Sequence, residues 1–332
     1  MIVMSSREVE ERLDLDRLID ALAAAHADLS AGRVSMPTRI AAMVGERDGM
    51  LAAMPVYLPS AGVLTTKLVT LFPGNAGSPL PTHQAVIAAF DPATGEPLAL
   101  LDGTAITAIR TGAASALSVR LLARPDADTL ALLGSGVQAR SHARAIARVR
   151  PLAEIRVASR NRGRAAALAA ELTEELGVPA RSCSGYEDAV RGAGLVAATT
   201  HSPEPVVERE WLAPGTHVTS VGVNPNGREV AGEVVRDALV VVESRSAALA
   251  PYPAGSNDLL WAIRDGLIDT GHVHAELGEI AAGSADGRSG DDQITLYKSV
   301  GVAIQDAAAV SLVLGGLDAA SGTTVDLGGS EH

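Results

Sequence analysis

The sequence predicts an α/β protein in which a doubly wound parallel sheet of the Rossmann type is joined to an α+β domain. The first observation is an alternation of short apolar runs and helical segments that begins near Thr129. The second is the different texture of residues 39–101, where Gly and Pro break the apolar runs as in antiparallel hairpins. The third is the length of 332 residues, which allows about two domains.

The elements can be predicted in chain order. Apolar residues first recur on one helical face, which indicates a single helix over residues 1 to about 30. Hairpin strands follow up to residue 101, and then an alanine-rich helix at 106–122. The parallel sheet is expected from five apolar runs, at 130–133, 155–158, 195–199, 218–221 and 239–242. Further helices are expected at 137–149, 162–176 and 299–314, and the polar tail from Ser321 is expected to fray.

Composition and charge exclude several classes of partner. With 27 basic and 39 acidic residues the formal net charge is -12, which argues against a nucleic-acid or anionic-membrane partner. A single cysteine, Cys183, excludes an intramolecular disulfide and a cysteine-based zinc site. No run approaches the ~18 apolar residues of a membrane span, and no signal-like segment follows Met1. We therefore expect a cytoplasmic protein.

A glycine turn predicts a dinucleotide site. The run LALLGSGVQA at 130–139 has the form strand, G-x-G-x-x-A, helix. Gly134 would make the tight turn, Gly136 would let the backbone approach a pyrophosphate, and Ala139 would let the helix pack closely. Val137 and Gln138 open the helix, whose free N–H groups attract phosphate. The flanking strand and helix favour dinucleotide binding over a plain turn.

The end of the next predicted strand indicates which nicotinamide cofactor binds. An NAD site places Asp or Glu there to bind the ribose hydroxyls. This chain has VASRNR at 157–162, without an acid. Ser159, Arg160 and Asn161 suit a 2′-phosphate, because arginine grips phosphate through two hydrogen bonds. The run therefore favours NADP(H), with NAD(H) still possible, over a simple solvated loop.

Three cations lie in segments where charge is unexpected. Lys67 interrupts an apolar strand, Arg110 lies in the alanine-rich helix, and Arg39 follows a Pro-Thr turn. A charge in an apolar setting needs a partner. Together the three could clamp a carboxylate, whereas each alone fits a structural ion pair equally well.

The remaining candidate binding residues are histidines and residues that follow the predicted strands. His201 follows a predicted strand at the edge where doubly wound folds bind ligands, and Val223 follows the next strand. Both are assigned to the cofactor. His272 and His274 alternate, but no carboxylate spacing around them makes a metal site, and we expect no metal.

Several stretches together resemble the ornithine cyclodeaminase/mu-crystallin family. They are LTTKLVT at 64–70, residues 102–114, the glycine turn at 134–139, AELGE at 275–279 and YKSVG at 297–301. The resemblance runs to about residue 314. It implies a substrate-binding and dimerisation domain of residues 1–115 and 306–332, a Rossmann domain of residues 116–305, and a homodimer through the substrate domains.

The resemblance also implies roles for particular residues. The three cations would hold the carboxylate of the substrate. Thr111 and the Gly134 turn would contact the cofactor phosphates, and residues 159–161 the adenosine end. From their positions, Met54 and Asn224 are expected to face the substrate.

One residue departs from the cyclodeaminase pattern. Cyclodeaminases of this family carry an aspartate in a Gly-Ala-Asp stretch after the strand predicted here at 218–221, and this chain has Asn224 in its place. An amide is a poor general base. The ketimine-reductase branch also lacks that aspartate and favours NADPH.

These features predict reduction of a small imino acid or cyclic ketimine by NADPH to an L-amino acid. Examples are a pyrroline or piperideine carboxylate, or the imine of a 2-oxo acid and an amine. Lys67 is the expected catalytic residue, which supplies or retains the proton at nitrogen. The alternatives are an ornithine or lysine cyclodeaminase with recycled NAD, an amino-acid dehydrogenase of the alanine type, and a non-catalytic crystallin-like binder.

Overall fold

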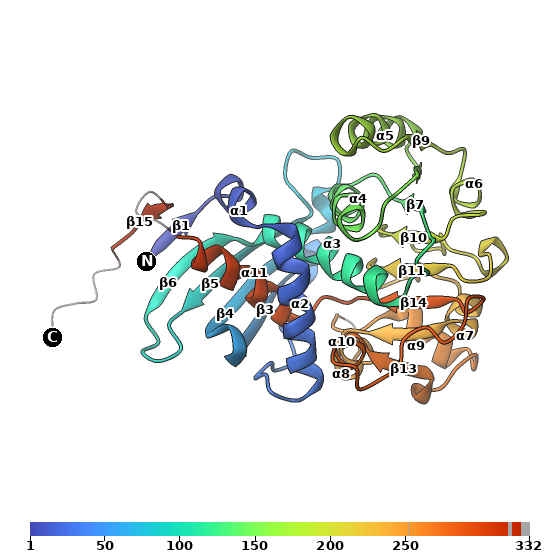
Figure 1. The fold of residues 1–332 in the computed structure, drawn as a ribbon. Coiled ribbons are helices and arrows are strands. Elements are labelled where there is room, and N and C mark those ends of the chain that lie inside the picture. Colours follow the sequence, from blue (N-terminus) through green and yellow to red (C-terminus); the bar gives the residue numbers. More distant parts are fainter. Residues whose placement is uncertain (252, 318–320, 327–332) are drawn as a thin grey trace. The chain divides into compact units, whose positions relative to one another are not determined.

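The computed structural model describes residues 1–251, 253–317 and 321–326 (Figure 1). The chain divides into two compact units. Unit 1 comprises Met1–Arg110 and Val302–His332, and unit 2 comprises Thr111–Gly301. Both boundaries lie a few residues before the expected positions. One falls inside helix α3 (Gly103–Leu122), so a continuous helix carries the chain from unit 1 into unit 2.

Unit 1 is built on a seven-stranded mixed sheet. Its strand order is β15-β1-β6-β5-β4-β3-β2, and β1 pairs in parallel with β6 while the other neighbours are antiparallel. The strands are β1 (Ile2–Met4), β2 (Ile40–Val44), β3 (Gly49–Leu58), β4 (Val63–Leu71), β5 (His83–Phe90), β6 (Pro97–Asp102) and β15 (Thr323–Thr324). The predicted hairpins of residues 39–101 are therefore present.

The prediction of a single helix over residues 1 to about 30 is wrong. The segment forms strand β1 and then two helices, α1 (Ser6–Arg12) and α2 (Leu15–Ser30). Leu13 has non-helical dihedrals of φ -96° and ψ 89°, and the Asp14 side chain caps α2 by accepting a hydrogen bond from the Arg17 N–H. The apolar periodicity continues across this break, which is why the sequence suggested one helix.

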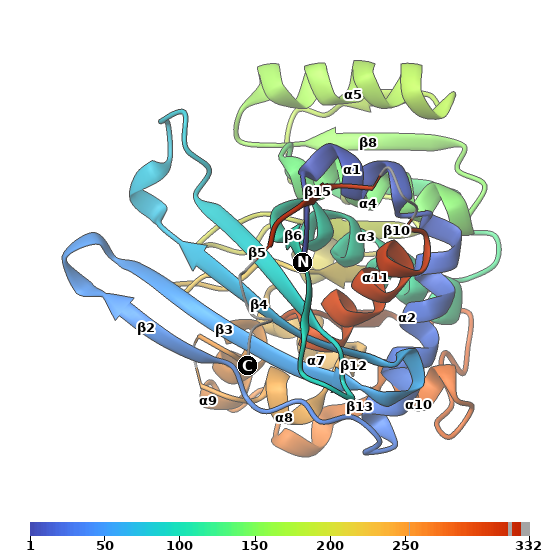
Figure 2. The ribbon, with the colours of Figure 1, turned by 90° about the vertical axis from the view of Figure 1, so that its left-hand side faces the viewer.

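Helices cover one face of this sheet. Helix α11 (Ala303–Gly315) packs against α2, β3 and β4, and Figure 2 shows α2 and α11 on the same side of the strands. Strand residues alternate in burial, as a sheet covered on one face requires. The tail was expected to fray from Ser321. Instead β15 pairs with β1, and residues 327–332 lie outside the described part.

Unit 2 is a doubly wound α/β unit, as predicted. Its eight strands are all parallel in the order β13-β12-β14-β11-β10-β7-β8-β9. The strands are β7 (Thr129–Leu133), β8 (Glu154–Ala158), β9 (Ala180–Ser182), β10 (Leu195–Ala198), β11 (His217–Ser220), β12 (Leu239–Val242), β13 (Val273–Glu276) and β14 (Thr295–Lys298). The helices are α4 (Val137–Val149), α5 (Arg162–Leu176), α6 (Tyr186–Val190), α7 (Gly232–Asp237), α8 (Arg245–Ala248), α9 (Asn257–Arg264) and α10 (Leu277–Ala281).

The sequence missed strands β9, β13 and β14. Strand β14 lies between β11 and β12, and all four of its residues are buried. Its sequence Thr-Leu-Tyr-Lys is not an apolar run, which explains why it was not recognised. The sheet core is aliphatic, built from Val, Leu, Ile and Ala of the strands and the surrounding helices.

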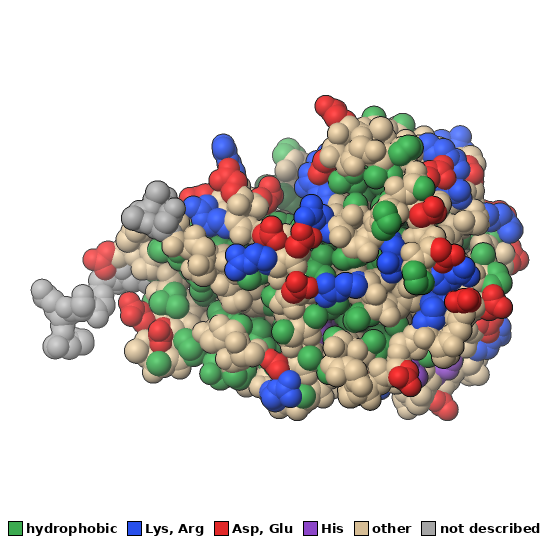
Figure 3. Space-filling model, in the orientation of Figure 1, with side chains coloured by type: hydrophobic (Ala, Val, Ile, Leu, Met, Phe, Trp, Pro, Cys, Tyr) green, Lys and Arg blue, Asp and Glu red, His purple; other side chains and the backbone are tan. Residues whose placement is uncertain are grey.

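The face of the molecule that Figure 3 shows carries charges of both signs. On the face that Figure 3 shows, Lys and Arg side chains are interspersed with Asp and Glu. Ion pairs also join α4 and α5, between Arg140 and Glu171 and between Arg144 and Glu175. Within the described ranges, none of the helices combines the length and apolar character that crossing a bilayer requires.

Candidate active site

Unit 1 buries two of the predicted cations against one carboxylate. Lys67 Nζ lies 2.8 Å from Asp306 Oδ2, and Arg110 Nε donates a hydrogen bond to Asp306 Oδ1 at 3.0 Å. The three side chains come from β4, α3 and α11, and none is more than 5% exposed. The structure therefore brings Lys67 and Arg110 together, as the sequence suggested, through a carboxylate that sequence reasoning missed.

The cluster continues into a chain of hydrogen bonds. The second guanidinium nitrogen of Arg110 donates to Gln305 Oε1 at 2.6 Å. The Gln305 amide nitrogen then donates to His26 Nε2 at 3.1 Å, because its oxygen already accepts from arginine. Gln305 and Asp306 are fully or almost fully buried polar residues in an Ala- and Val-rich helix. Such residues need buried partners, and that signal was available in the sequence.

The electrostatics of the cluster set the protonation of Lys67. The pKa of Lys67 is lowered to about 8, chiefly by burial and also by the charges of Arg110 and Arg39, while Asp306 acts in the opposite direction. Burial alone would raise the pKa of Asp306. Lys67 and Arg110 outweigh that effect and hold the pKa of this carboxyl below its usual value. Lys67 is thus poised to gain or lose a proton at mildly alkaline pH.

Met54 and Arg39 lie at the borders of this cluster. Met54 is the cross-strand partner of Lys67 in the β3–β4 pairing and is buried on the same face of the sheet. Arg39, partly exposed before β2, is close enough for its charge to influence the pKa of Lys67. All the residues expected on the substrate side, apart from Asn224, therefore belong to unit 1.

Unit 2 contains the glycine turn in the predicted form. Gly134 follows β7 with φ +120°, and a Cβ atom there would lie 2.6 Å from Thr199 Oγ1, so only glycine fits. Gly136 is the N-cap residue of α4, and a Cβ atom on it would enter open space as far as the described residues extend. Val137 is 70% exposed at the start of the helix, and Gln138 follows it.

Helix α3 approaches the helix of the glycine turn closely. A Cβ atom on Gly112 would lie 2.6 Å from the carbonyl oxygen of Ser141 in α4. Thr111, the preceding residue, is 7% exposed. In the described chain the first turn of α4 has no capping side chain, so its backbone N–H groups can receive an anion. These features fit the phosphates of a dinucleotide.

The residues expected at the adenosine end lie beside the turn. Ser135 Oγ donates a hydrogen bond to Ser159 Oγ at 2.9 Å, which links the glycine turn to the end of β8. Asn161 caps α5 by accepting a hydrogen bond from the Arg164 N–H. Arg160 is exposed between them. Ser159 and Asn161, which were predicted to bind the adenosine end, therefore also stabilise the loop after β8.

Two further loops meet at the carboxyl ends of β10 and β11. Asn224 Nδ2 donates a hydrogen bond to the His201 carbonyl oxygen at 2.8 Å, and Asn224 Oδ1 accepts one from the Asn226 N–H at 2.9 Å. The side chain of Asn224 therefore ties its own turn to the loop after β10. Val223, next to it, is half-buried.

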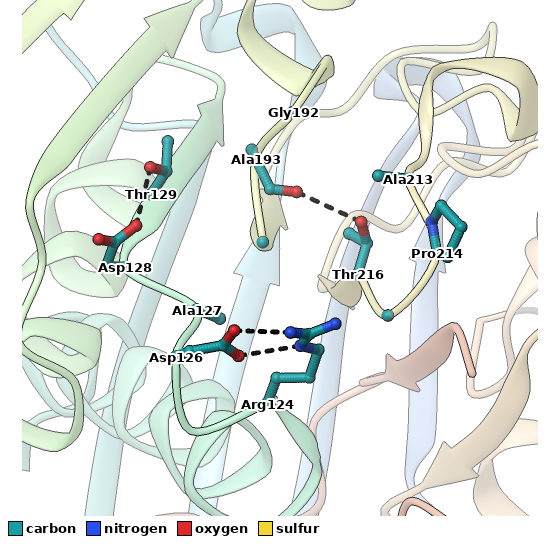
Figure 4. Close-up of a pocket in the computed structure, with 12 residues that line it drawn as sticks. Arg124, Asp126, Ala127, Asp128, Thr129, Gly192, Ala193, Ala213, Pro214 and Thr216 are labelled. Carbon is teal, nitrogen blue, oxygen red and sulfur yellow. Dashed lines mark hydrogen bonds and ion pairs between the residues drawn. The ribbon is translucent and has the colours of Figure 1, made fainter. Parts of the chain in front are cut away.

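A pocket lies at the opposite edge of this sheet. It is bordered by the segments that precede β7, β10 and β11 (Figure 4). Arg124 pairs with both carboxylate oxygens of Asp126, and Thr216 Oγ1 donates to the Ala193 carbonyl oxygen. Ligands of doubly wound sheets bind at the carboxyl ends of the strands. Since this pocket is at the amino ends, we do not assign the cofactor to it.

The described residues were expected to form no metal site, and their side chains bear on that expectation. The part of the chain that the structure describes holds no group of three or more His, Cys, Asp or Glu side chains that could bind a metal ion. His272 and His274 instead contact backbone carbonyl oxygens, of Val235 at 2.8 Å and of Asp286 at 2.9 Å.

The parallel sheet and its glycine turn define a Rossmann-type dinucleotide-binding protein. Comparison with known proteins gives the family. The model of the ornithine cyclodeaminase/mu-crystallin family matches residues 1–320, and the chain belongs to this family. The resemblance predicted from the sequence is confirmed, and so is the fold class.

Three relatives illustrate the similarity. The chain is 37% identical to ketimine reductase mu-crystallin of Mus musculus over 315 residues, which cover 93% of this chain and 95% of the relative. It is 36% identical to Thermococcus litoralis Delta(1)-pyrroline-2-carboxylate reductase, solved with NADH and L-proline, with a TM-score of 0.94 and coverage of 98% and 100%. It is 32% identical to an archaeal alanine dehydrogenase dimer with bound NAD, with a TM-score of 0.87 and 94% coverage of each chain.

Proposed function

We propose that this chain is a reductase that uses NADPH in preference to NADH and converts a small imino acid or cyclic ketimine to an L-amino acid. Unit 1 would bind the substrate and unit 2 the cofactor. The observation that carries the proposal is the buried group of Lys67, Arg110 and Asp306, in which a lysine has a pKa of about 8. Relatives that reduce ketimines or pyrroline-2-carboxylate support it.

The cluster suits an anionic substrate that needs a proton. Two cations and one carboxylate leave a net positive charge, to which Arg39 adds, in a chain whose formal net charge is -12. A substrate carboxylate would be drawn to this charge. Asp306 holds Lys67 and Arg110 at fixed positions, so little reorganisation is needed when the substrate binds.

Lys67 is the proposed catalytic residue. When bound, the nicotinamide supplies hydride to the imine carbon. A protonated imine accepts hydride more readily, and Lys67 Nζ would supply or retain the proton at the imine nitrogen. A group with a pKa of about 8 is protonated in most molecules at neutral pH yet gives up its proton easily.

The preference for NADPH rests on the end of β8. Ser159, Arg160 and Asn161 occupy the place where an acidic residue would bind the ribose of NAD. Arg160 is exposed there and carries the positive charge that a 2′-phosphate requires.

The contacts of Asn224 disfavour the cyclodeaminase alternative. Its amide nitrogen donates to a carbonyl oxygen, which a carboxylate could not do. The turn is therefore stabilised by an amide in particular, and the same side chain offers no strong base. We therefore expect the activity assay described below to detect no deamination of ornithine or lysine.

We also propose a homodimer formed through the sheet of unit 1. The face of this sheet that α2 and α11 leave bare carries apolar side chains that are between 36% and 42% exposed. They are Leu51, Tyr57, Leu68, Val86 and Leu98. Leu68 and Val86 are direct cross-strand neighbours, so the apolar surface is continuous at its centre. A second copy would remove this surface from water, and an archaeal relative is a dimer.

The decisive assay follows oxidation of NADPH by its near-ultraviolet absorbance. Pyrroline-2-carboxylate, piperideine-2-carboxylate and mixtures of 2-oxo acids with amines would be compared, with NADH and L-ornithine alongside. We expect rapid oxidation with at least one cyclic imine. Lys67→Ala should abolish it while NADPH binding stays nearly intact.

Other outcomes would favour the other functions. Strict dependence on ammonia and pyruvate would indicate an alanine-type dehydrogenase, and ammonia release from ornithine without net cofactor consumption would indicate a cyclodeaminase. If the protein binds NADPH but turns over none of these substrates, the remaining function is that of a non-catalytic binding protein.

A further inference from the structure

Lys298 is a fully buried lysine whose role the proposed chemistry leaves open. It is the last residue of β14, and its Nζ uses all three of its protons. It donates to Ser220 Oγ at 3.0 Å and to the Gly222 carbonyl oxygen at 2.7 Å, and it pairs with Asp258 Oδ2 at 2.7 Å. Two of these partners, Ser220 and Gly222, lie at the carboxyl end of the adjacent strand β11.

A buried carboxylate holds the same turn from the other side. Glu229 Oε2 accepts hydrogen bonds from Ser220 Oγ and from the Gly222 N–H, both at 2.8 Å. Glu229 Oε1 accepts from the Thr200 N–H at 2.5 Å and from the Thr200 hydroxyl at 2.7 Å. Because Thr200 follows β10, Glu229 joins the ends of two neighbouring strands.

Asp258 fixes both charged residues. Its Oδ1 accepts from the backbone N–H groups of Glu229 and Val230, at 2.7 and 2.8 Å, and its Oδ2 accepts from Ser256 Oγ and pairs with Lys298. Burial of three charges is costly unless their hydrogen bonds are satisfied. Here backbone groups and the hydroxyls of Thr200, Ser220 and Ser256 supply those partners.

The outcome is that Gly222 is clamped through both of its backbone polar groups. The N–H of Gly222 is held by Glu229 and its carbonyl by Lys298. A Cβ atom on Gly222 would lie 2.4 Å from the Thr200 carbonyl oxygen and 2.6 Å from Glu229, so the clamp closes only around glycine. The Gly222 carbonyl belongs to the peptide group between Gly222 and Val223, so Lys298 holds that peptide directly.

The strand order places this clamp toward the nicotinamide end of a bound dinucleotide. The glycine turn follows β7, and the residues proposed for adenosine follow β8. The other half of the cofactor then extends over β10 and β11, on the opposite side of β7. We infer that Lys298 and Glu229 are positioning residues that set the backbone at Gly222–Val223 for the nicotinamide. The inference rests on the dinucleotide site of the proposed function.

Two variants test this role. Lys298→Met keeps the length of the side chain and removes its three donors, and Glu229→Gln exchanges one acceptor oxygen for a donor. We expect binding of ADP-ribose, measured by calorimetry, to stay within about twofold, because the phosphate and adenosine contacts remain. We expect the emission of bound NADPH to change and kcat to fall roughly 10- to 100-fold, as a misplacement of about 1 Å can cause.

A double variant separates positioning from charge balance. Lys298→Met/Asp258→Asn removes both charges of the buried ion pair, so neither partner is left unpaired, and Glu229 keeps its own hydrogen bonds. If Lys298 positions the turn, the double variant recovers the midpoint of thermal unfolding toward that of the wild type but keeps the altered NADPH emission and the low kcat. Leu172→Ala, a cavity in the buried face of α5, provides a destabilised control with unchanged emission and kcat.

The results that would refute the positioning role of Lys298 and Glu229 differ from those that would refute the proposed imine reduction. Wild-type emission and kcat in the double variant, or ADP-ribose binding lost as severely as NADPH binding, would overturn the positioning role. If the wild type reduces no imine, the proposed reaction fails, but ADP-ribose binding and NADPH emission still decide the inference. If Lys298→Met does not fold, Glu229→Gln gives the same readings.

Discussion

Lys67 Nζ and Asp306 Oδ2 lie 2.8 Å apart in the interior of unit 1, where the two side chains are 3% and 1% exposed. They come from opposite ends of the chain, so the C-terminal helix completes a site that begins in the N-terminal sheet. The pair also explains why an Ala- and Val-rich helix carries a carboxylate on its buried side.

This pair makes the pH dependence of catalysis a direct test. If protonated Lys67 serves the reaction, kcat/KM falls as pH rises through about 8. Asp306→Asn removes the charge that raises the pKa of Lys67, while burial and Arg110 continue to lower it. The alkaline limb of the pH–rate profile should therefore move to lower pH. Asp28→Asn, which breaks an ion pair with Arg33 in the same unit, should leave the limb in place. If the alkaline limb of Asp306→Asn stays at the wild-type pH, the limb does not report the titration of Lys67.

The cofactor preference can be tested by reversing one charge. Arg160→Glu should weaken NADPH binding far more than NADH binding, by roughly tenfold or more for NADPH, because a hydrogen bond to a charged group contributes about 1.5–3 kcal/mol. Fluorescence titration of both cofactors measures this. Arg236→Glu makes the same charge change at the end of α7, just before the amino end of β12 and away from the cofactor edge. Equal losses for the two cofactors with Arg160→Glu would contradict the phosphate assignment.

How far the sequence predicted the fold depended on periodicity. The glycine turn, β7 and the helices Val137–Val149 and Arg162–Leu176 were located because apolar periods and turn residues agree there. Strand β14 was missed because it ends in a lysine whose partners, at Ser220, Gly222 and Asp258, come from distant parts of the chain. No local pattern reveals such a pairing.

The candidate site was predicted unevenly for the same reason. Lys67 and Arg110 stood out because a cation in an apolar segment needs a partner. The partner, Asp306, lies in a helix that was expected, and a carboxylate in that Ala- and Val-rich run needs a buried partner. No local pattern shows that this partner is Lys67. Asn224 was singled out by resemblance alone, and its hydrogen bond to the His201 carbonyl became visible only in the structure.

The proposed dimer can be tested on the bare face of the unit 1 sheet. Leu68→Asp places a charge beside Val86 at the centre of the apolar surface. Burying that carboxylate without a partner is costly, so the variant should dissociate to monomers at concentrations where the wild type is dimeric. Sedimentation velocity or light scattering measures the change. Leu80→Asp, at a 59% exposed residue between β4 and β5, should stay dimeric. A wild type that is monomeric at high concentration would refute the dimer.

Two buried histidines predict how stability depends on pH. Burial lowers the pKa of His142 to about 4 and that of His217 to about 3. The Nδ1 proton of His142 is donated to the Gln138 carbonyl oxygen, since a carbonyl can only accept, and Nε2 accepts from the Ser115 hydroxyl. His142 is thus neutral in the folded chain.

The sign follows from proton binding. Between pH of about 6.5 and about 4 the unfolded chain binds a proton at His142 that the folded chain does not, so the free energy of unfolding falls as pH falls through this window. The loss is roughly 3 kcal/mol for His142, at 1.36 kcal/mol per pKa unit, and His217 adds to it. Urea unfolding at several pH values measures the slope. His142→Gln keeps a donor and an acceptor but cannot titrate. The free energy of unfolding of this variant should therefore depend less steeply on pH than that of the wild type. An unchanged slope would show that His142 is not responsible.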